Sequence, residues 1–162
     1  MSFRAIWHFS FHVADLDRSV DFYTRMIGMN LIHRQVQNND YTSALVGYPE
    51  AHLRIAQFAM PERSKDAVST HDLELVEYVN PRVEALVIER ARPGTAHLAF
   101  AVSDIDVEYT RLNSQGVRFV SPPNLISSGV NKGGSTCYFL DPDGITLEML
   151  QPPTSSFQPT SR

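Results

Sequence analysis

The sequence is poor in the features on which secreted, membrane-bound and polyanion-binding proteins depend. Its 162 residues include one cysteine, Cys137, so no intramolecular disulfide can form and nothing points to an oxidising compartment. A net charge of −4 provides no basic face for nucleic acid or anionic lipid. No stretch approaches the roughly 18 apolar residues of a membrane span, and the start, MSFRAIWHFSF, lacks the apolar run of a secretory leader. We therefore expect a cytoplasmic protein with no nucleic-acid and no membrane partner.

The chain does contain an internal repeat. HFSFHVAD at residues 8–15 and HLAFAVSD at residues 97–104 each begin with histidine and end with aspartate seven positions later. Apolar residues then recur every three or four positions, which predicts a helix capped by Asp15 or Asp104. Gly28 and Gly116 stand where a left-handed residue ends a helix. The repeat predicts two copies of one module.

Each predicted helix is followed by strand-like runs and a closing Leu-Glu pair, in DLELVEYV at 72–79 and ITLEML at 145–150. In the second copy, DPDG has the residues of a tight turn between the last two strands. Each copy therefore has the pattern β-α-β-β-β. We predict an α+β fold in which two tandem βαβββ modules form a cupped mixed β-sheet around a metal site.

The predicted organisation has four segments. They are a first βαβββ module at 1–80, a linker at 81–95, a second βαβββ module at 96–151 and a disordered or loosely draped tail at 152–162. Within the first module, DYTSALVGYPE at 40–50 is expected to be irregular. Within the second, the glycines and serines of LISSGVNKGGS indicate a mobile loop.

The metal site is predicted from strand alternation. Because side chains alternate across a strand, His8 and His97 each lie on the polar face of the first strand of a module. The same alternation separates Glu74 and Glu148 from the apolar residues on either side of them. A pseudo-twofold relation would bring these four side chains together, a donor set suited to zinc, nickel, cobalt, manganese or iron. One such residue alone is more often structural, but equivalent placement in both copies favours a divalent metal site.

Other polar residues fit this site less well. His12 lies about 13 Å beyond His8 along an extended strand, too far to share an ion easily, although it can line the pocket. Glu77 is the main rival of Glu74, but it lies on the opposite strand face and its counterpart is Gln151. The remaining histidines have no counterpart in the other copy and are assigned surface or structural roles: His33, His52 and His71.

Four stretches carry a resemblance to a known family: HFSFHVADLDRSVDFYTRMIGM, LELVEY, GTAHLAFAVSDID and YFLDPDGITLEML. Over residues 5–151 the chain resembles the vicinal oxygen chelate superfamily. That superfamily includes glyoxalase I, methylmalonyl-CoA epimerase, extradiol dioxygenases and bleomycin- or fosfomycin-resistance proteins. The pattern is closest to glyoxalase I and methylmalonyl-CoA epimerase. In those branches the metal ligands fall at the positions matched here by His8, Glu74, His97 and Glu148.

The resemblance implies a metal-dependent isomerase, epimerase or lyase that moves a proton next to a metal-bound carbonyl. It implies Glu148 or Glu74 as the catalytic base, and similarity to the epimerases adds Glu50, in GYPEAHLRI, as a further candidate base. The expected substrate is a small-molecule carbonyl compound, with a thioester or a thiol adduct as candidate forms. The resemblance and the long linker also predict a homodimer.

Two other classes within the family remain as alternatives. An Fe(II) extradiol-type ring-cleavage dioxygenase uses a further histidine shortly before the YFLDPDGITLE segment, and this sequence has no histidine after His97. Glu74 is also a ligand that such an enzyme does not need. A metal-free small-molecule-binding resistance protein is the second alternative, and retention of all four ligand types counts against it.

Overall fold

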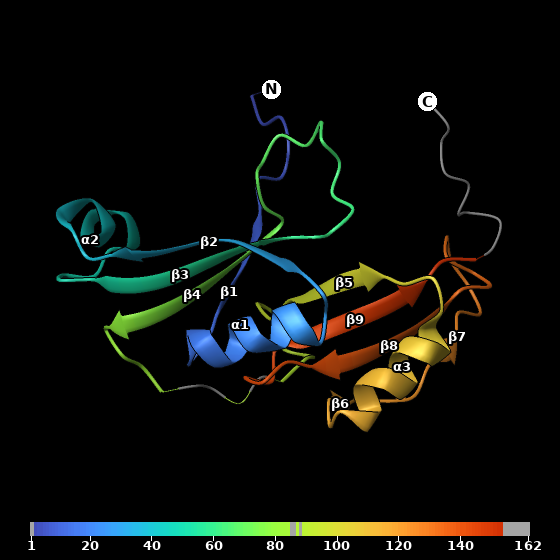
Figure 1. Cartoon of the computed structure of the whole chain (residues 1–162). Helices are drawn as coiled ribbons and strands as arrows, with labels where there is room; N and C mark the ends of the chain where they lie inside the picture. Colours follow the sequence, from blue (N-terminus) through green and yellow to red (C-terminus); the bar gives the residue numbers. More distant parts are fainter. Residues whose placement is uncertain (1, 85–86, 88, 154–162) are drawn as a thin grey trace. The chain divides into compact units, whose positions relative to one another are not determined.

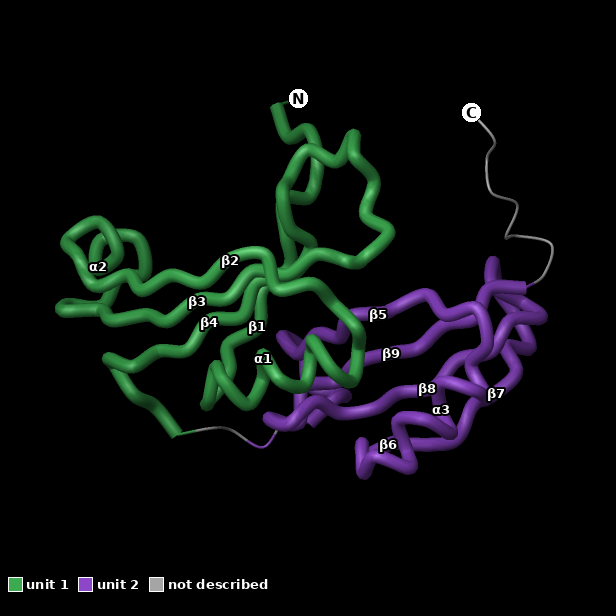
Figure 2. Tube along the Cα trace, in the orientation of Figure 1, with its two compact units in different colours: residues 1–86 green, residues 87–162 purple. Residues whose placement is uncertain are grey.

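The computed structural model describes residues 2–84, 87 and 89–153 of the chain. The chain divides into two compact units, Met1–Leu86 and Val87–Arg162 (Figure 2). The boundary falls within the segment 81–95 that was predicted as a linker. Residues 154–162, which make up most of the predicted tail, lie outside the described residues.

The first unit is a four-stranded mixed sheet with two helices (Figure 1). Its strand order is β1-β4-β3-β2, with β1 parallel to β4 and the other neighbours antiparallel. Its elements are β1 (Phe9–His12), α1 (Leu16–Arg25), β2 (Asn30–Gln37), α2 (Asp40–Val46), β3 (His52–Ala59) and β4 (Leu73–Asn80).

The second unit repeats this order as β5-β9-β8-β6, with β5 parallel to β9, and adds a short strand, β7, beside β8. Its elements are β5 (His97–Ala101), α3 (Ile105–Ser114), β6 (Arg118–Phe119), β7 (Asn124–Leu125), β8 (Ser135–Leu140) and β9 (Thr146–Gln151). The strand order in each unit fits the cupped sheet expected from the sequence. The prediction of an α+β fold built from two βαβββ modules is confirmed.

Both helix starts and both helix ends follow the local signals in the sequence. Asp15 is the N-cap of α1, and its Oδ1 accepts a hydrogen bond from the backbone N–H of Arg18 at 3.1 Å. Asp104 caps α3 by accepting from two backbone N–H groups of the first turn. Gly28 and Gly116 have φ values of 84° and 82°, a region that favours glycine. These four predictions are confirmed.

The prediction of an irregular passage over residues 40–50 is wrong for residues 40–46, where the helix α2 forms. Asn39 caps it, with Oδ1 accepting from the backbone N–H of Thr42 at 3.0 Å, and Gly47 ends it at a φ of 74°. A helix of seven residues is too short to show apolar periodicity over two full turns. The only features of the sequence that indicate this helix are therefore its two capping residues, Asn39 and Gly47.

The helices α1 and α3 pack on their sheets through aromatic side chains. Tyr23 of α1 is fully buried and its ring lies 6.1 Å from that of Phe58 in β3. In the second unit, Tyr109 of α3 contacts Phe119, which in turn packs on Phe139 of β8. Each unit therefore has its own apolar core between helix and sheet.

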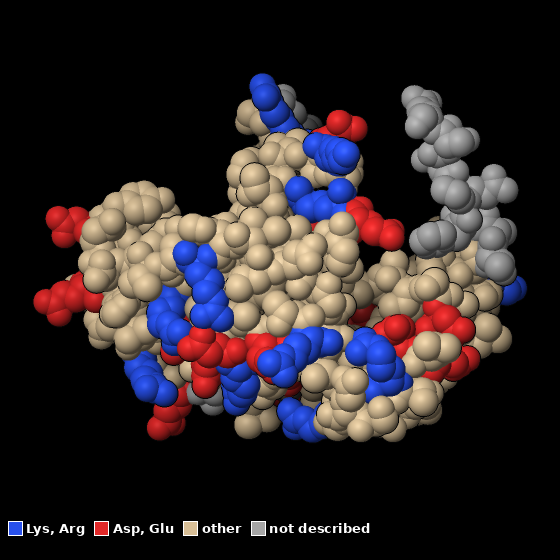
Figure 3. Space-filling model, viewed as in Figure 1, with Lys and Arg blue, Asp and Glu red and all other residues tan. Residues whose placement is uncertain are grey.

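Two surface properties bear on the predicted partners. None of the helices in the described part of the chain has the length and the apolar character needed to cross a membrane. On the face shown in Figure 3, acidic and basic side chains lie interleaved.

Cys137 lies in β8 with 3% of its surface exposed. Burial, and secondarily the charge of Glu148, raises the pKa of its thiol to about 11. We therefore expect no reaction with a thiol reagent in native protein at pH 8, and full reaction after unfolding in urea, because the thiolate is the reactive form. Rapid labelling of the native protein would contradict this burial.

The same shift makes stability depend on pH. The thiol ionises at lower pH in the unfolded chain than in the folded chain, so its contribution is intact below pH 9 and is lost as pH rises toward about 11. The loss is on the order of 2 kcal/mol. Urea unfolding of wild type and Cys137→Ala at pH 8 and pH 11 checks this. Between these two pH values the free energy of unfolding should fall by about 2 kcal/mol more in wild type than in Cys137→Ala, which has no thiol to ionise.

Candidate metal site

The strand registers of the two units place histidine and glutamate equivalently. In the first unit, β1 and β4 pair Ser10 with Glu74, and in the second, β5 and β9 pair Ala99 with Glu148. In both units a histidine stands two residues before the paired residue of the first strand. Because two residues is the period of side-chain direction in a strand, this histidine and the glutamate share one face of the sheet.

In the second unit the pair is in close contact. His97 Nε2 lies 3.0 Å from Glu148 Oε2. The other carboxylate oxygen, Oε1, accepts a hydrogen bond from the hydroxyl of Thr136 in β8 at 2.5 Å. The Glu148 side chain is 13% exposed and that of His97 is 46% exposed. The carboxylate is therefore held from one side while its second oxygen faces the imidazole.

The first unit repeats this arrangement with a wider separation. His8 Nε2 lies 3.8 Å from Glu74 Oε1, and Glu74 Oε2 accepts from the side-chain amide of Gln57 in β3 at 3.0 Å. The Glu74 side chain is 15% exposed. In each unit a neighbouring strand holds one carboxylate oxygen, and the other faces the Nε2 atom of the histidine. An imidazole nitrogen and the carboxylate oxygen that faces it are a donor pair that fits a divalent metal ion, and the hydrogen bond to the other oxygen orients the carboxylate.

His71 is a residue of this region that sequence reasoning missed. It is 3% exposed, and its Nε2 lies 3.0 Å from His8 Nδ1 and 3.9 Å from Glu74 Oε2. Each of the three side chains offers a metal-ligand atom within 4.8 Å of the others. Burial, followed by the proximity of His8, lowers the pKa of His71 and so favours the neutral ring.

Nothing in the sequence pattern singles out His71. The strand β4 begins only at Leu73, so side-chain alternation does not extend back to residue 71. The signal that remained was a histidine three positions before a predicted metal ligand.

Glu77, the rival of Glu74, faces α1 and has a structural role. Its Oε2 accepts from the backbone N–H of Leu16, the first residue of α1, at 3.3 Å, and from Arg54 at 2.8 Å. In the second unit Gln151 accepts from the backbone N–H of Ile105, the first residue of α3, at 2.8 Å. Glu77 and Gln151 therefore make the same interaction in the two units: each accepts a hydrogen bond from the backbone N–H of the first residue of the helix.

This equivalence gives a prediction for Glu77. Glu77→Gln keeps an acceptor oxygen of the kind that Gln151 provides, and we expect a loss of less than about 1 kcal/mol in the free energy of unfolding. Glu77→Leu leaves the N–H of Leu16 without this acceptor and should cost about 1–3 kcal/mol. Urea unfolding measures both. Metal content should be unchanged in both variants, and its loss in Glu77→Leu at full folding would make Glu77 a ligand.

The structure does not bring Glu50 to Glu74. Glu50 lies exposed on the turn before β3, with a φ of 54°, and its backbone carbonyl accepts from the side chain of Asn80. Residue 57, which pairs with Glu74, lies about 17 Å farther along β3 than residue 52. The role of Glu50 as a base stays a prediction from the resemblance. His12, also exposed, packs its ring against Tyr78 at 5.2 Å, not against the histidine and glutamate pair.

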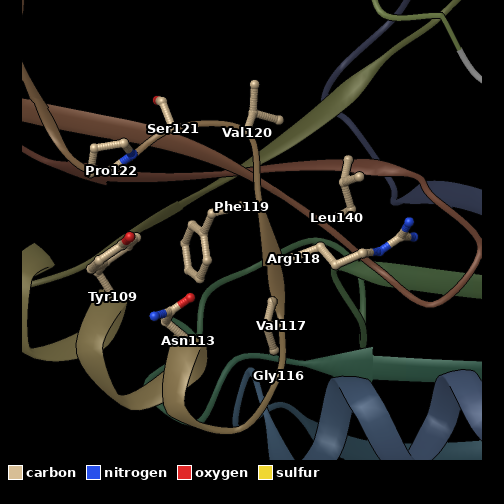
Figure 4. A pocket seen from close by; sticks show the side chains of 10 residues that line it. All are labelled: Tyr109, Asn113, Gly116, Val117, Arg118, Phe119, Val120, Ser121, Pro122 and Leu140. Atoms are coloured by element: carbon tan, nitrogen blue, oxygen red, sulfur yellow. The ribbon is translucent and has the colours of Figure 1, made fainter.

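A separate open hollow lies in the second unit between α3 and β6 (Figure 4). The side chains of Tyr109 and Phe119 stand side by side in it, and Arg118 is its charged residue. None of the predicted metal ligands lines this hollow. It therefore does not belong to the candidate metal site.

The fold and the repeated histidine and glutamate positions define a class of two-module proteins. Residues 5–149 match the model of the Glyoxalase/Bleomycin resistance protein/Dioxygenase superfamily. The chain belongs to this superfamily, which confirms the resemblance seen in the sequence.

Individual relatives have names of enzymes. The chain is 32% identical to a 2-epi-5-epi-valiolone epimerase of Actinomyces sp, over 94% of this chain and 81% of that one. It is 25% identical to a lactoylglutathione lyase of Arabidopsis thaliana, over 91% of this chain but only 44% of the plant protein. It thus spans less than half the length of that relative. Among solved structures, a glyoxalase family protein from Bacillus cereus superposes with a TM-score of 0.75 at 23% identity, over 94% of this chain and 99% of that one.

Proposed function

We propose that this protein is a metal-dependent isomerase, epimerase or lyase that moves a proton on the carbon next to a carbonyl group. The observation that carries the proposal is the histidine and glutamate pair repeated at the same register in both units. Relatives named epimerase and lactoylglutathione lyase support an activity of the isomerase or lyase type.

The residues proposed to hold the divalent ion are His8, Glu74, His97 and Glu148. That the two pairs share one ion is part of the proposal and rests on the repeat. Two imidazole nitrogens and two carboxylate oxygens suit zinc, nickel, cobalt, manganese or iron(II). When bound, such an ion supplies a Lewis acid that polarises a carbonyl oxygen and acidifies the adjacent C–H.

The proton is taken and returned by a carboxylate oxygen, for which Glu148 Oε2 and Glu74 Oε1 are the two candidates, and the oxygen that acts as base would not be a ligand of the ion at the same time. Each belongs to a carboxylate whose second oxygen is already held, by Thr136 in one unit and by Gln57 in the other. The hydrogen bond to the second oxygen fixes the direction of the oxygen that would take the proton, and a fixed direction favours efficient proton transfer. Both carboxylates are largely shielded from water, with 13% and 15% of the side chain exposed.

The test begins with metal analysis of protein purified without an affinity tag or added metal, where about one ion per chain is expected. The metal-loaded protein is then incubated in D2O with 2-epi-5-epi-valiolone, with the adduct of glutathione and a 2-oxoaldehyde, and with 2-methyl thioesters. Deuterium uptake by one of these compounds, followed by NMR, supports the proposal. Absence of metal at every stage of purification and after reconstitution contradicts it.

The homodimer is a further prediction. Light scattering at micromolar concentrations is expected to give twice the mass of one chain, 18.2 kDa. A monomer across this range would contradict it.

A further inference from the structure

The two ring nitrogens of His8 face different partners. Nε2 faces Glu74 Oε1 at 3.8 Å, and Nδ1 lies 3.0 Å from His71 Nε2. In the second unit it is again Nε2, of His97, that faces the glutamate. Nε2 is therefore the atom that faces the glutamate in both modules, and Nδ1 of His8 remains for His71.

The positions of the protons follow from this geometry. A neutral imidazole carries one proton, and a nitrogen that binds a metal ion must be unprotonated. With Nε2 as ligand, the proton of His8 is on Nδ1 and is donated to His71 Nε2. The proton of His71 is then on its own Nδ1, which lies 3.4 Å from the hydroxyl oxygen of Thr70. The Thr70 hydroxyl can accept a hydrogen bond from His71 Nδ1–H, so each donated proton in this series of hydrogen bonds has an acceptor.

His71 is held firmly enough to act as a fixed acceptor. It is 3% exposed, its backbone N–H donates to Ser69 Oγ at 3.1 Å, and the Ser69 hydroxyl donates to the His71 carbonyl at 2.7 Å. Its ring centroid lies 4.8 Å from that of His8 at an interplanar angle of 31°. A contact of 3.0 Å between nitrogens at this ring separation is a hydrogen bond and not a stacked pair.

The second module provides an internal comparison. The residue three positions before Glu148 is Ile145, which is 5% exposed and has no hydrogen-bonding side chain. The His97 side chain is 46% exposed, against 29% for His8. In the first module the side chain of His71 can therefore orient the metal-site histidine, whereas the second module has the apolar side chain of Ile145 at that position.

We infer that His71 is a positioning residue, which holds the proton of His8 on Nδ1 and so directs the Nε2 lone pair toward the metal ion. This inference rests on the proposed metal site. Partners of this kind fix the tautomer and the ring orientation of a metal-binding histidine, and losing one typically costs about 10–100-fold in metal affinity.

Two variants test the inference through metal affinity. His71→Ile introduces the residue that the second module has at the equivalent position, and His71→Gln keeps an oxygen that can accept from His8 Nδ1–H. Competitive zinc titration should show affinity about 10–100-fold weaker in His71→Ile and mostly recovered in His71→Gln. Circular dichroism and thermal unfolding in EDTA establish that both variants fold.

Nitrogen-15 NMR of zinc-loaded wild type tests the same inference without any variant. We expect protonated Nδ1 atoms on His8 and His71, the zinc-induced shift on His8 Nε2, and an unprotonated, zinc-free Nε2 on His71. A zinc-bound His71 Nε2 would make His71 a ligand and overturn the inference, as would wild-type zinc affinity in folded His71→Ile. Wild type that binds no zinc, nickel, cobalt, manganese or iron(II) overturns the proposed function and this inference together, whereas the preceding outcomes overturn only the inference.

Discussion

Replacing His8 or His97 with alanine is expected to remove most of the bound metal and to lower the melting temperature measured with metal present. Each substitution removes one of the two imidazole ligands of the proposed site. An ion present at 100 times its dissociation constant stabilises the folded chain by about 2.7 kcal/mol, and for a chain of this size that corresponds to about 5–10 °C. Elemental analysis and thermal unfolding, with and without EDTA, measure both effects.

His12→Ala is the matched control, because His12 is an exposed residue of the same region whose ring packs on Tyr78. This variant should keep its metal. In EDTA the melting temperatures of wild type and His97→Ala should converge, since the missing stability comes from the ion. Loss of metal in His12→Ala but not in His8→Ala would mean that the register assigned to the first strand is wrong and that the metal lies farther along the same face of β1.

The same measurements test whether the two modules share one ion. If they do, His8→Ala and His97→Ala should each lose most of the bound metal. If each pair binds its own ion, each variant retains half of the wild-type content, and the single shared site must be given up.

The features that the sequence predicts well depend on local physics. The caps at Asp15 and Asp104 and the glycines that end both helices act within one helical turn, so their residue types alone indicate them. The placement of Glu74 and Glu148 in equivalent strand positions follows from the repeat and from the period of a strand. Local signals and the internal repeat together define the two modules.

What the sequence does not predict depends on contacts between distant residues. His71 and His8 are 63 positions apart, and their contact exists because β1 and β4 pair in parallel. Alternation predicts which face Glu77 occupies, but its role at the start of α1 becomes visible only when the helix lies over that face. The short helix α2 was missed because seven residues give no periodicity, although both of its caps are present.

The second large effect is expected from Glu148→Gln, which should abolish exchange of the proton next to the substrate carbonyl. If Glu148 is the base, the amide cannot take up the proton, and the rate should fall by at least about 100-fold. If Glu148 is mainly a ligand, exchange is lost because metal is lost. The metal content of the variant tells these two cases apart, and Glu74→Gln measured in parallel assigns the base to one carboxylate.

Thr136→Val is a useful companion to Glu148→Gln, because it keeps the carboxylate and removes the hydroxyl that donates to Glu148 Oε1. We expect it to keep most of its metal and to show slower exchange, since the carboxylate is less firmly directed. Exchange at the wild-type rate would show that this hydrogen bond does not orient the base.

Oxygen consumption separates proton transfer from ring cleavage. The proposed enzyme should exchange the proton in D2O without taking up oxygen, and it should not cleave catechols in an oxygen electrode. Two carboxylate ligands leave fewer open positions for O2 and a chelating catechol than a site with two histidines and one carboxylate. Oxygen uptake that requires Fe(II) and persists in Glu74→Ala would therefore replace the proposed function with a dioxygenase. Tight binding of an aromatic drug by metal-free protein, without turnover in either assay, would instead favour the resistance proteins of the same superfamily.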